Sequence, residues 1–222
     1  MTLTALLLTA FVIGLVHALE PDHMVAVTTF VTRRPGARAA VGFGVRWGFG
    51  HALAVLIVGT ILIVMGIQVP PGLEAGLETL VGVVLVGLGV WVLRKARTLT
   101  AHEHMDESGE THTHIHVHGD REHHRHGHAL GMVGALHGLA GTGPVVALIP
   151  LALSDSRLAA GSYLAIFGIG TIVGMAIFAL AVGWFYGETA QRSERVAQGL
   201  AVAVGLASVG VGAWWIFEAM GG

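Results

Sequence analysis

The stretch AAVGFGVRWGFGHALAVLIVGTILIVMG, residues 39–66, decides the fold class. Arg46 is its single Asp, Glu, Lys or Arg, and most of the other residues are apolar or glycine. A helix needs about 20 apolar residues to cross a bilayer core that is about 30 Å thick. The stretch is long enough, so we expect a transmembrane helix here.

Five further windows have the same character, and they are residues 2–20, 76–93, 129–153, 158–185 and 196–217. Pro21 follows the first window and removes a helix hydrogen bond, so we expect this span to continue to residue 31 as a broken segment. No Lys or Arg precedes its apolar part, which favours a retained span over a cleaved signal. The sequence therefore predicts an all-α polytopic membrane protein with six transmembrane helices.

The composition agrees with a membrane location. The 222 residues are 54% hydrophobic and only 12% charged, with a mean hydropathy of +0.73. Soluble domains carry about 25% charged residues. A net charge of -2 offers no basic surface for nucleic acid, and the absence of cysteine excludes disulfides and thiolate metal sites.

The basic residues predict the orientation in the membrane. Ten of the 12 Lys and Arg residues fall in the loops after the first, third and fifth spans, and only Arg157 falls in the opposite loops. Positively charged loops remain in the cytoplasm. We therefore expect a multi-pass protein of the inner or plasma membrane with both termini outside.

The two halves of the chain resemble each other. Residues 14–19 (GLVHAL) align with 134–139 (GALHGL), and residues 47–51 (WGFGH) align with 167–171 (FGIGT) at the same offset. Further along, Gly82, Gly87, Gly89 and Trp91 recur as Gly205, Gly210, Gly212 and Trp214. Three spans per copy would invert the second copy in the membrane, a plan common among secondary transporters. We predict inverted three-helix repeats at residues 1–97 and 129–222, separated by residues 98–128.

The segment HALEPDH, residues 17–23, places two imidazoles and two carboxylates at the end of the first span. One charged group at membrane depth costs at least about 2.5–3.5 kcal/mol, and a bound dication would compensate for several. His17 and Asp22 would point about 140° apart on an ideal helix. We expect Pro21 to free the His17 carbonyl and to turn Asp22 and His23 back toward His17. The alternative is a helix end whose charges extend into cytoplasmic water.

These residues also carry a resemblance to a known family. HALEPDH resembles the His-x4-Asp-His signature of the nickel/cobalt transporter family, and WGFGHALAV, residues 47–55, resembles its second motif. HGLAGTGP, residues 137–144, resembles the segment that opens the second half of shorter urease-accessory and nickel-export relatives. The larger members have eight spans, so the branch, and with it the transport direction, stays open.

Together, the motif and the resemblance give a set of candidate metal ligands. They are His17, Asp22, His23, His51, His137 and Glu20. Imidazole and carboxylate donors suit nickel, cobalt or zinc. A lone buried histidine that binds a neighbouring carbonyl is the alternative for His51. Arg46 either pairs with Asp22 or Glu20 when no metal is bound, or extends its guanidinium to the interface.

Residues 98–128 differ in kind from the spans. Their ten histidines are His102, His104, His112, His114, His116, His118, His123, His124, His126 and His128. Because the tract has no hydrophobic period, we expect a flexible cytoplasmic loop that buffers metal. A dispensable solvated linker is the alternative.

The sequence thus predicts a secondary permease that imports Ni²⁺ or Co²⁺, with no enzymatic activity and no catalytic cofactor. A nickel/cobalt efflux protein is the first alternative, and a membrane accessory protein or a di-metal hydroxylase is less favoured. The chain has no phosphate-binding loop for ATP and no HExxH protease motif. Its expected partners are the ion and the bilayer, and a cytoplasmic metallochaperone or a second copy of the chain is left open.

Overall fold

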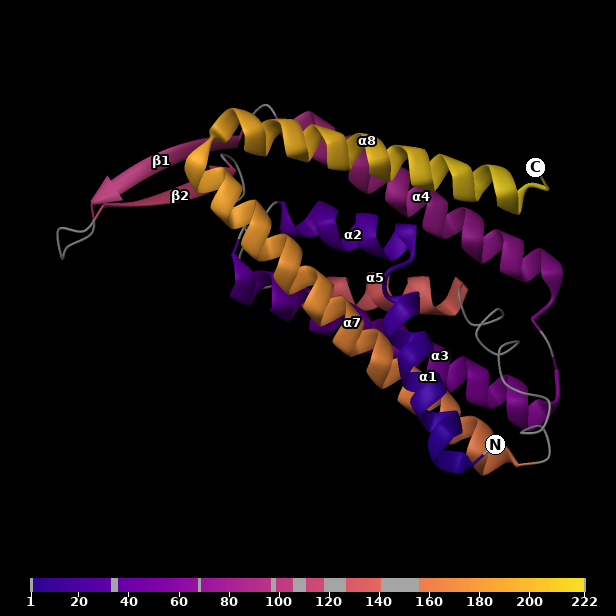
Figure 1. Ribbon diagram of the computed structural model, residues 1–222. Helices are drawn as coiled ribbons and strands as arrows, with labels where there is room; N and C mark the ends of the chain where they lie inside the picture. The colour runs from indigo at the N-terminus through magenta and orange to yellow at the C-terminus, as the bar shows by residue number, and fades with distance from the viewer. Residues whose placement is uncertain are drawn as a thin grey trace.

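The computed structural model describes residues 2–32, 36–67, 69–96, 99–105, 111–117, 127–140 and 156–221 (Figure 1). The helices are α1 Leu3–His17, α2 Pro21–Val31, α3 Ala37–Met65, α4 Pro71–Ala96, α5 Gly127–Ala140, α7 Arg157–Arg192 and α8 Glu194–Ala219. Two strands, β1 Leu99–Met105 and β2 Thr111–Val117, pair in antiparallel order. The membrane body is helical, as predicted.

The first apolar segment is bent where the sequence predicts a break. The axes of α1 and α2 differ by 57°. Pro21 is the first residue of α2, a position where its missing N–H costs no helical hydrogen bond. Thr2 caps the start of α1 by accepting a hydrogen bond from the Ala5 backbone N–H.

Four helices, α3, α4, α7 and α8, are long and apolar enough to cross a membrane, and the bent pair α1–α2 makes up to five spans. The predicted span over residues 129–153 falls partly on α5, and its remainder lies outside the described residues. The described part of the chain therefore supports a multi-pass helical membrane protein. The sixth span stays a prediction.

Glycines bring the helices into backbone contact. A Cβ at Gly82 of α4 would meet the Gly212 carbonyl of α8, and a Cβ at Gly205 of α8 would lie 3.1 Å from the Gly89 carbonyl of α4. Ser208 donates a hydrogen bond to the Leu85 carbonyl across the same pair, at 2.8 Å. Such close approach by small residues is how helices associate in lipid.

The outward surface of these helices is apolar. Exposed large side chains lie along α3 and α7, among them Phe49, Ile57, Ile177 and Trp184. So many exposed large apolar side chains are unfavourable in water and fit a lipid environment.

The His-rich tract is more regular than predicted. Cα atoms of His102 and His104 in β1 oppose those of His114 and His112 in β2. The sequence THTHIHV of β2 alternates histidine with Thr, Ile or Val, and β-branched residues favour strands. A flexible loop was predicted for this tract, and no hairpin.

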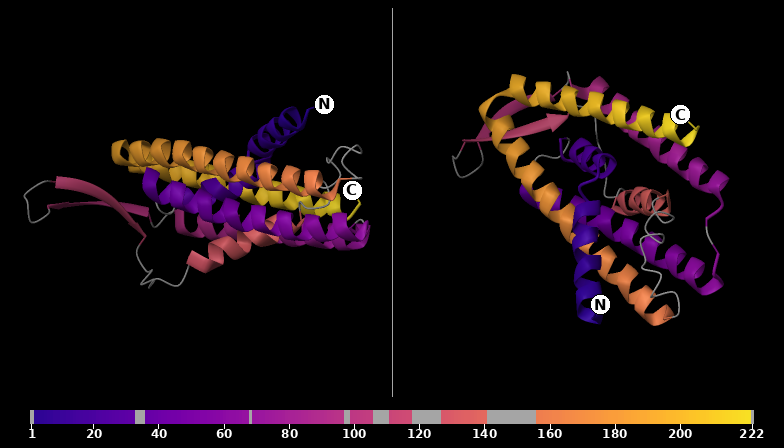
Figure 2. Two further views of the ribbon diagram at one scale, coloured as in Figure 1. Left: turned by 90° about the horizontal axis from the view of Figure 1, so that it is seen from below. Right: turned by 45° about the vertical axis from the view of Figure 1, so that its right-hand side comes forward.

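The ends of the helices fall into two groups. Figures 1 and 2 show both termini and the turn between α3 and α4 at one end of the molecule, and the hairpin with the α7–α8 turn at the other.

Candidate metal centre

The break between α1 and α2 holds four of the candidate ligands, His17, Glu20, Asp22 and His23. His17 is the last residue of α1, and Asp22 and His23 lie in the first turn of α2. The bend turns their side chains toward each other, with the His17 and His23 ring centroids 4.6 Å apart. A helix N-terminus also carries a partial positive charge that favours the Asp22 carboxylate.

One detail of the break differs from our expectation. We expected Pro21 to free the His17 carbonyl, but this carbonyl accepts a hydrogen bond of 3.0 Å from the Glu20 backbone N–H. A tight turn over residues 17–20 closes the end of α1, so the reorientation of Asp22 comes from the new helix axis.

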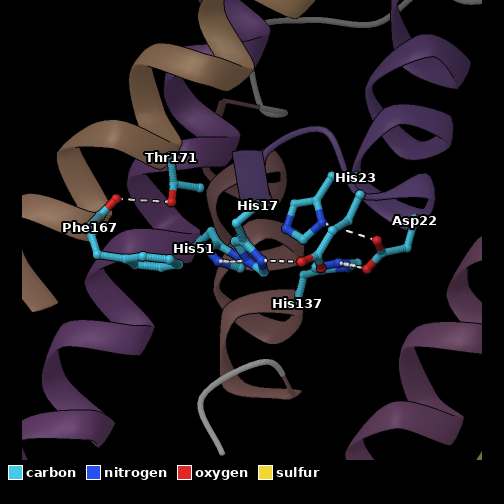
Figure 3. Close-up of polar contacts among 8 residues, drawn as sticks. His17, Asp22, His23, His51, His137, Phe167 and Thr171 are labelled. Atoms are coloured by element: carbon cyan, nitrogen blue, oxygen red, sulfur yellow. Dashed lines mark hydrogen bonds and ion pairs between the residues drawn. The ribbon is translucent and has the colours of Figure 1, made fainter. Parts of the chain in front are cut away.

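Two further helices complete the cluster, as Figure 3 shows. His51 of α3 places Nε2 at 3.3 Å from Nε2 of His17. His137 of α5 places Nε2 at 2.6 Å from Oδ2 of Asp22, while Oδ1 of the same carboxylate lies 3.2 Å from Nδ1 of His23. Residues far apart in sequence thus meet at one point.

Four of the five cluster residues are buried, and the His17 side chain is 11% exposed. His51 is 0% exposed, His23 1%, Asp22 2% and His137 6%. Three imidazoles and a carboxylate buried together are costly unless charge and hydrogen bonds are balanced. Nevertheless, Nε2 of His23 and Nδ1 of His51 are buried without a hydrogen-bond partner. Polar atoms left in this way call for an explanation, and for Nε2 of His23 a bound ion is one.

Two overlapping groups have the geometry to hold a metal ion. His17, His23 and His51 form the first, and Asp22, His23 and His137 form the second. Within each group the ligand atoms lie within 4.8 Å of one another. His23 belongs to both.

Glu20 and Arg46 lie outside these two groups. Oε1 of Glu20 lies 2.9 Å from Nδ1 of His17, and the Glu20 side chain is half-exposed. It can therefore orient the His17 ring, whose Nε2 faces the cluster. Arg46 is exposed and donates to the Gly42 carbonyl at 3.1 Å. The alternative in which Arg46 pairs with Asp22 or Glu20 is not seen among the described residues.

Two aromatic residues beside the cluster received no role from the sequence. The Phe167 ring lies 5.2 Å from His17, and the Trp47 ring lies 5.9 Å from His137. The sequence feature that could have identified them is that Trp47 and Phe167 align with each other in the internal repeat. Thr171, which aligns with His51, donates to the Phe167 carbonyl of its own helix at 3.1 Å.

The histidine-rich tract is described only in part. His102, His104, His112, His114 and His116 lie on the strands, and His128 lies in the first turn of α5. His118, His123, His124 and His126 lie outside the described residues, as do residues 141–144 of the HGLAGTGP segment.

Comparison with known proteins gives the family. A family model described as the transmembrane region of cytochrome c biogenesis proteins matches residues 9–207. The urease accessory protein UreH of Bacillus sp. (strain TB-90) is 30% identical over 181 residues, which cover 82% of this chain and 77% of UreH. The chain belongs to the family of that model and to the UreH family. The family resemblance inferred from the motifs is thereby confirmed.

Two more distant relatives of this UreH-family chain carry different names. A Methanocaldococcus jannaschii protein with the provisional name of nickel/cobalt efflux system is 24% identical over 78% of this chain and 74% of its own length. The Arabidopsis thaliana chloroplast protein FOR GROWTH AND FERTILITY 2 is 27% identical over 92% of this chain, which spans only 54% of that protein. No solved structure gives a significant match.

Proposed function

We propose that this chain is a secondary permease that carries Ni²⁺ or Co²⁺ across the membrane. The observation that carries the proposal is the largely buried cluster of His17, Asp22, His23, His51 and His137 at the bend between two apolar helices. Ionisable groups at such a place mark ion pathways in membrane proteins. Helix breaks near the midplane are where secondary transporters bind their ions.

The donor set supports a borderline transition metal. Imidazole nitrogens with one carboxylate suit Ni²⁺, Co²⁺ and Zn²⁺, while a thiolate site for Cu(I) is excluded because the chain has no cysteine. The name of the nickel/cobalt efflux relative favours nickel and cobalt over zinc. The names of UreH and of this relative describe accessory and efflux proteins, which supports a non-enzymatic role.

We further propose six spans arranged as two inverted repeats. This is supported by helix contacts that occur in pairs: when each residue of one contact is replaced by its partner in the repeat, the result is another observed contact. A Cβ at Gly14 would meet the Phe167 carbonyl, and a Cβ at its repeat partner Gly134 would meet the Trp47 carbonyl. Likewise, Gly82 approaches Gly212, while Gly205, the partner of Gly82, approaches Gly89. A two-fold relation between the halves accounts for both exchanges.

The proposed orientation puts both termini outside and the His-rich tract in the cytoplasm, where it buffers metal. The common end of the two termini in Figures 1 and 2 supports an even number of crossings. The cysteine-free chain permits a direct test. The Glu74→Cys variant should react with an impermeant thiol reagent added outside intact cells, and the Ser108→Cys variant should not. The reverse pattern would overturn this orientation.

For direction we propose uptake, and efflux is the second candidate because one relative carries that name. Cellular nickel and cobalt, measured with and without the gene, would decide. An importer predicts lower nickel in the deletion strain under metal limitation. An exporter predicts higher nickel under metal excess. Unchanged nickel and cobalt in both conditions, with zinc as the control metal, would contradict a permease of either direction.

A further inference from the structure

His23 lies between two histidines that are partners in the sequence repeat. Its ring centroid is 4.6 Å from that of His17 and 4.4 Å from that of His137. His17 aligns with His137 in the two repeats. A two-fold relation that exchanges the halves would therefore exchange the two neighbours of His23.

The aromatic surroundings of these neighbours follow the same exchange. Phe167 lies against His17, and its repeat partner Trp47 lies against His137. Each of these histidines thus lies beside an aromatic ring of the other repeat, Phe167 from α7 or Trp47 from α3. Paired environments on the two sides of His23 indicate two related positions for one ion, rather than one site with five ligands.

The two positions differ in their remaining ligands. The first, defined by His17, His23 and His51, offers three imidazoles. The second, defined by Asp22, His23 and His137, offers two imidazoles and a carboxylate. Thr171, the repeat partner of His51, donates its hydroxyl to the Phe167 carbonyl of its own helix.

The two positions also differ in the spacing of their ligand atoms. Nε2 of His17 and Nε2 of His51 are 3.3 Å apart and share a hydrogen bond. Two imidazoles on one tetrahedral ion with bonds of about 2.0–2.1 Å would stand about 3.3–3.4 Å apart, so the first position is already spaced for an ion. In the second, the hydrogen bond between Asp22 and His137 is shorter, at 2.6 Å, so these two ligands must move apart before an ion replaces their shared proton.

We propose that the transported ion occupies these two positions in succession, with His23 as the ligand common to both. The ion binds first to His17, His23 and His51, and passes to Asp22 and His137 when their hydrogen bond opens. This inference rests on the proposed function. In an inverted-repeat carrier the two related positions would face opposite sides of the membrane.

The test uses the full-length chain in detergent and in proteoliposomes, with the ten tract histidines replaced by glutamine so that the tract does not bind the probe. Co²⁺ is the probe for binding, by titration and by X-ray absorption, and radioactive nickel is the probe for uptake. His51→Ala removes a ligand of the first position alone, and His137→Ala removes one of the second. His23→Ala affects both, and Thr171→Val is the matched control.

Two positions predict that His51→Ala and His137→Ala each still bind one Co²⁺ per chain, while uptake falls to the level of empty vesicles. X-ray absorption should then find three imidazoles per Co²⁺ in His137→Ala, and two with a carboxylate oxygen in His51→Ala. His23→Ala should lose binding, and Thr171→Val should behave like the parent chain. If His51→Ala does not fold, His51→Gln takes its place.

Loss of binding in both single variants, or one identical ligand set in both, would overturn the two positions. Near-normal uptake by either variant would overturn the succession. These failures are distinct from a failure of the proposed function, in which the parent chain itself moves neither nickel nor cobalt, whatever its binding pattern.

Discussion

His137 Nε2 lies 2.6 Å from Asp22 Oδ2, so one hydrogen bond joins α5 to the first turn of α2 between residues that are 115 apart in sequence. Both side chains are buried. The contact links the two halves of the chain at the candidate metal centre, and it is the shortest polar contact among the cluster residues.

Removal of His137 should destabilise the protein through the carboxylate left behind. His137→Ala deprives buried Asp22 of one partner, a loss that costs about 1–3 kcal/mol. In the Asp22→Asn background the same substitution should cost less, because no buried charge remains. Thermal unfolding in detergent measures both. If His137→Ala lowers the unfolding midpoint equally in the two backgrounds, Asp22 and His137 are not energetically coupled.

Glu20 should act on the ion through His17. The carboxylate 2.9 Å from Nδ1 orients the ring, and loss of such an outer partner typically weakens metal affinity by about 10–100-fold. Glu20→Gln should therefore raise the metal concentration for half-maximal uptake by this factor while uptake at saturation persists. Complete loss of uptake at every concentration would instead make Glu20 a direct ligand of the ion.

The glycine contacts between α4 and α8 provide a matched pair of substitutions two residues apart. A Cβ at Gly89 would lie 2.6 Å from the Gly205 carbonyl, whereas a Cβ at Gly87 would meet nothing within 4 Å. Gly89→Val should cost about 1–3 kcal/mol by overpacking, and Gly87→Val about 0.5 kcal/mol or less. Thermal unfolding of the two variants in the same detergent compares them. Similar midpoints would contradict this helix packing.

Removal of the His-rich tract should change metal handling without stopping transport. With residues 99–126 replaced by a short Gly/Ser linker, uptake at saturating metal should persist because the cluster lies elsewhere. Uptake at trace metal should change. Its pH dependence near about 6.5, where free imidazoles become protonated and release metal, should also weaken. Vesicle uptake across metal concentration and pH measures this, and no uptake at any concentration by a folded deletion protein would place the tract in the pathway.

Local chemistry explains what the sequence could predict. Apolar length alone placed the spans at residues 39–66 and 196–217, close to the observed Ala37–Met65 and Glu194–Ala219. Pro21 likewise marked the break between α1 and α2, because its effect on a helix depends on no distant residue.

Contacts between distant helices explain what the sequence left open. The pairing of Asp22 with His137, rather than with Arg46, depends on where α5 passes α2. The position of Glu20 beside His17 depends on the turn that ends α1. The repeat aligned Trp47 with Phe167, but only the fold sets each ring beside a histidine of the opposite repeat.

Uptake of radioactive nickel by proteoliposomes that contain the purified chain tests the central claim most directly. The parent chain should take up nickel against competition by zinc, and Asp22→Ala should reduce uptake to that of empty vesicles while it remains folded, as judged by gel filtration. Thr171→Val should transport like the parent chain. Near-normal uptake by Asp22→Ala, or no nickel or cobalt uptake by the parent chain, would contradict a permease that carries the ion through this cluster.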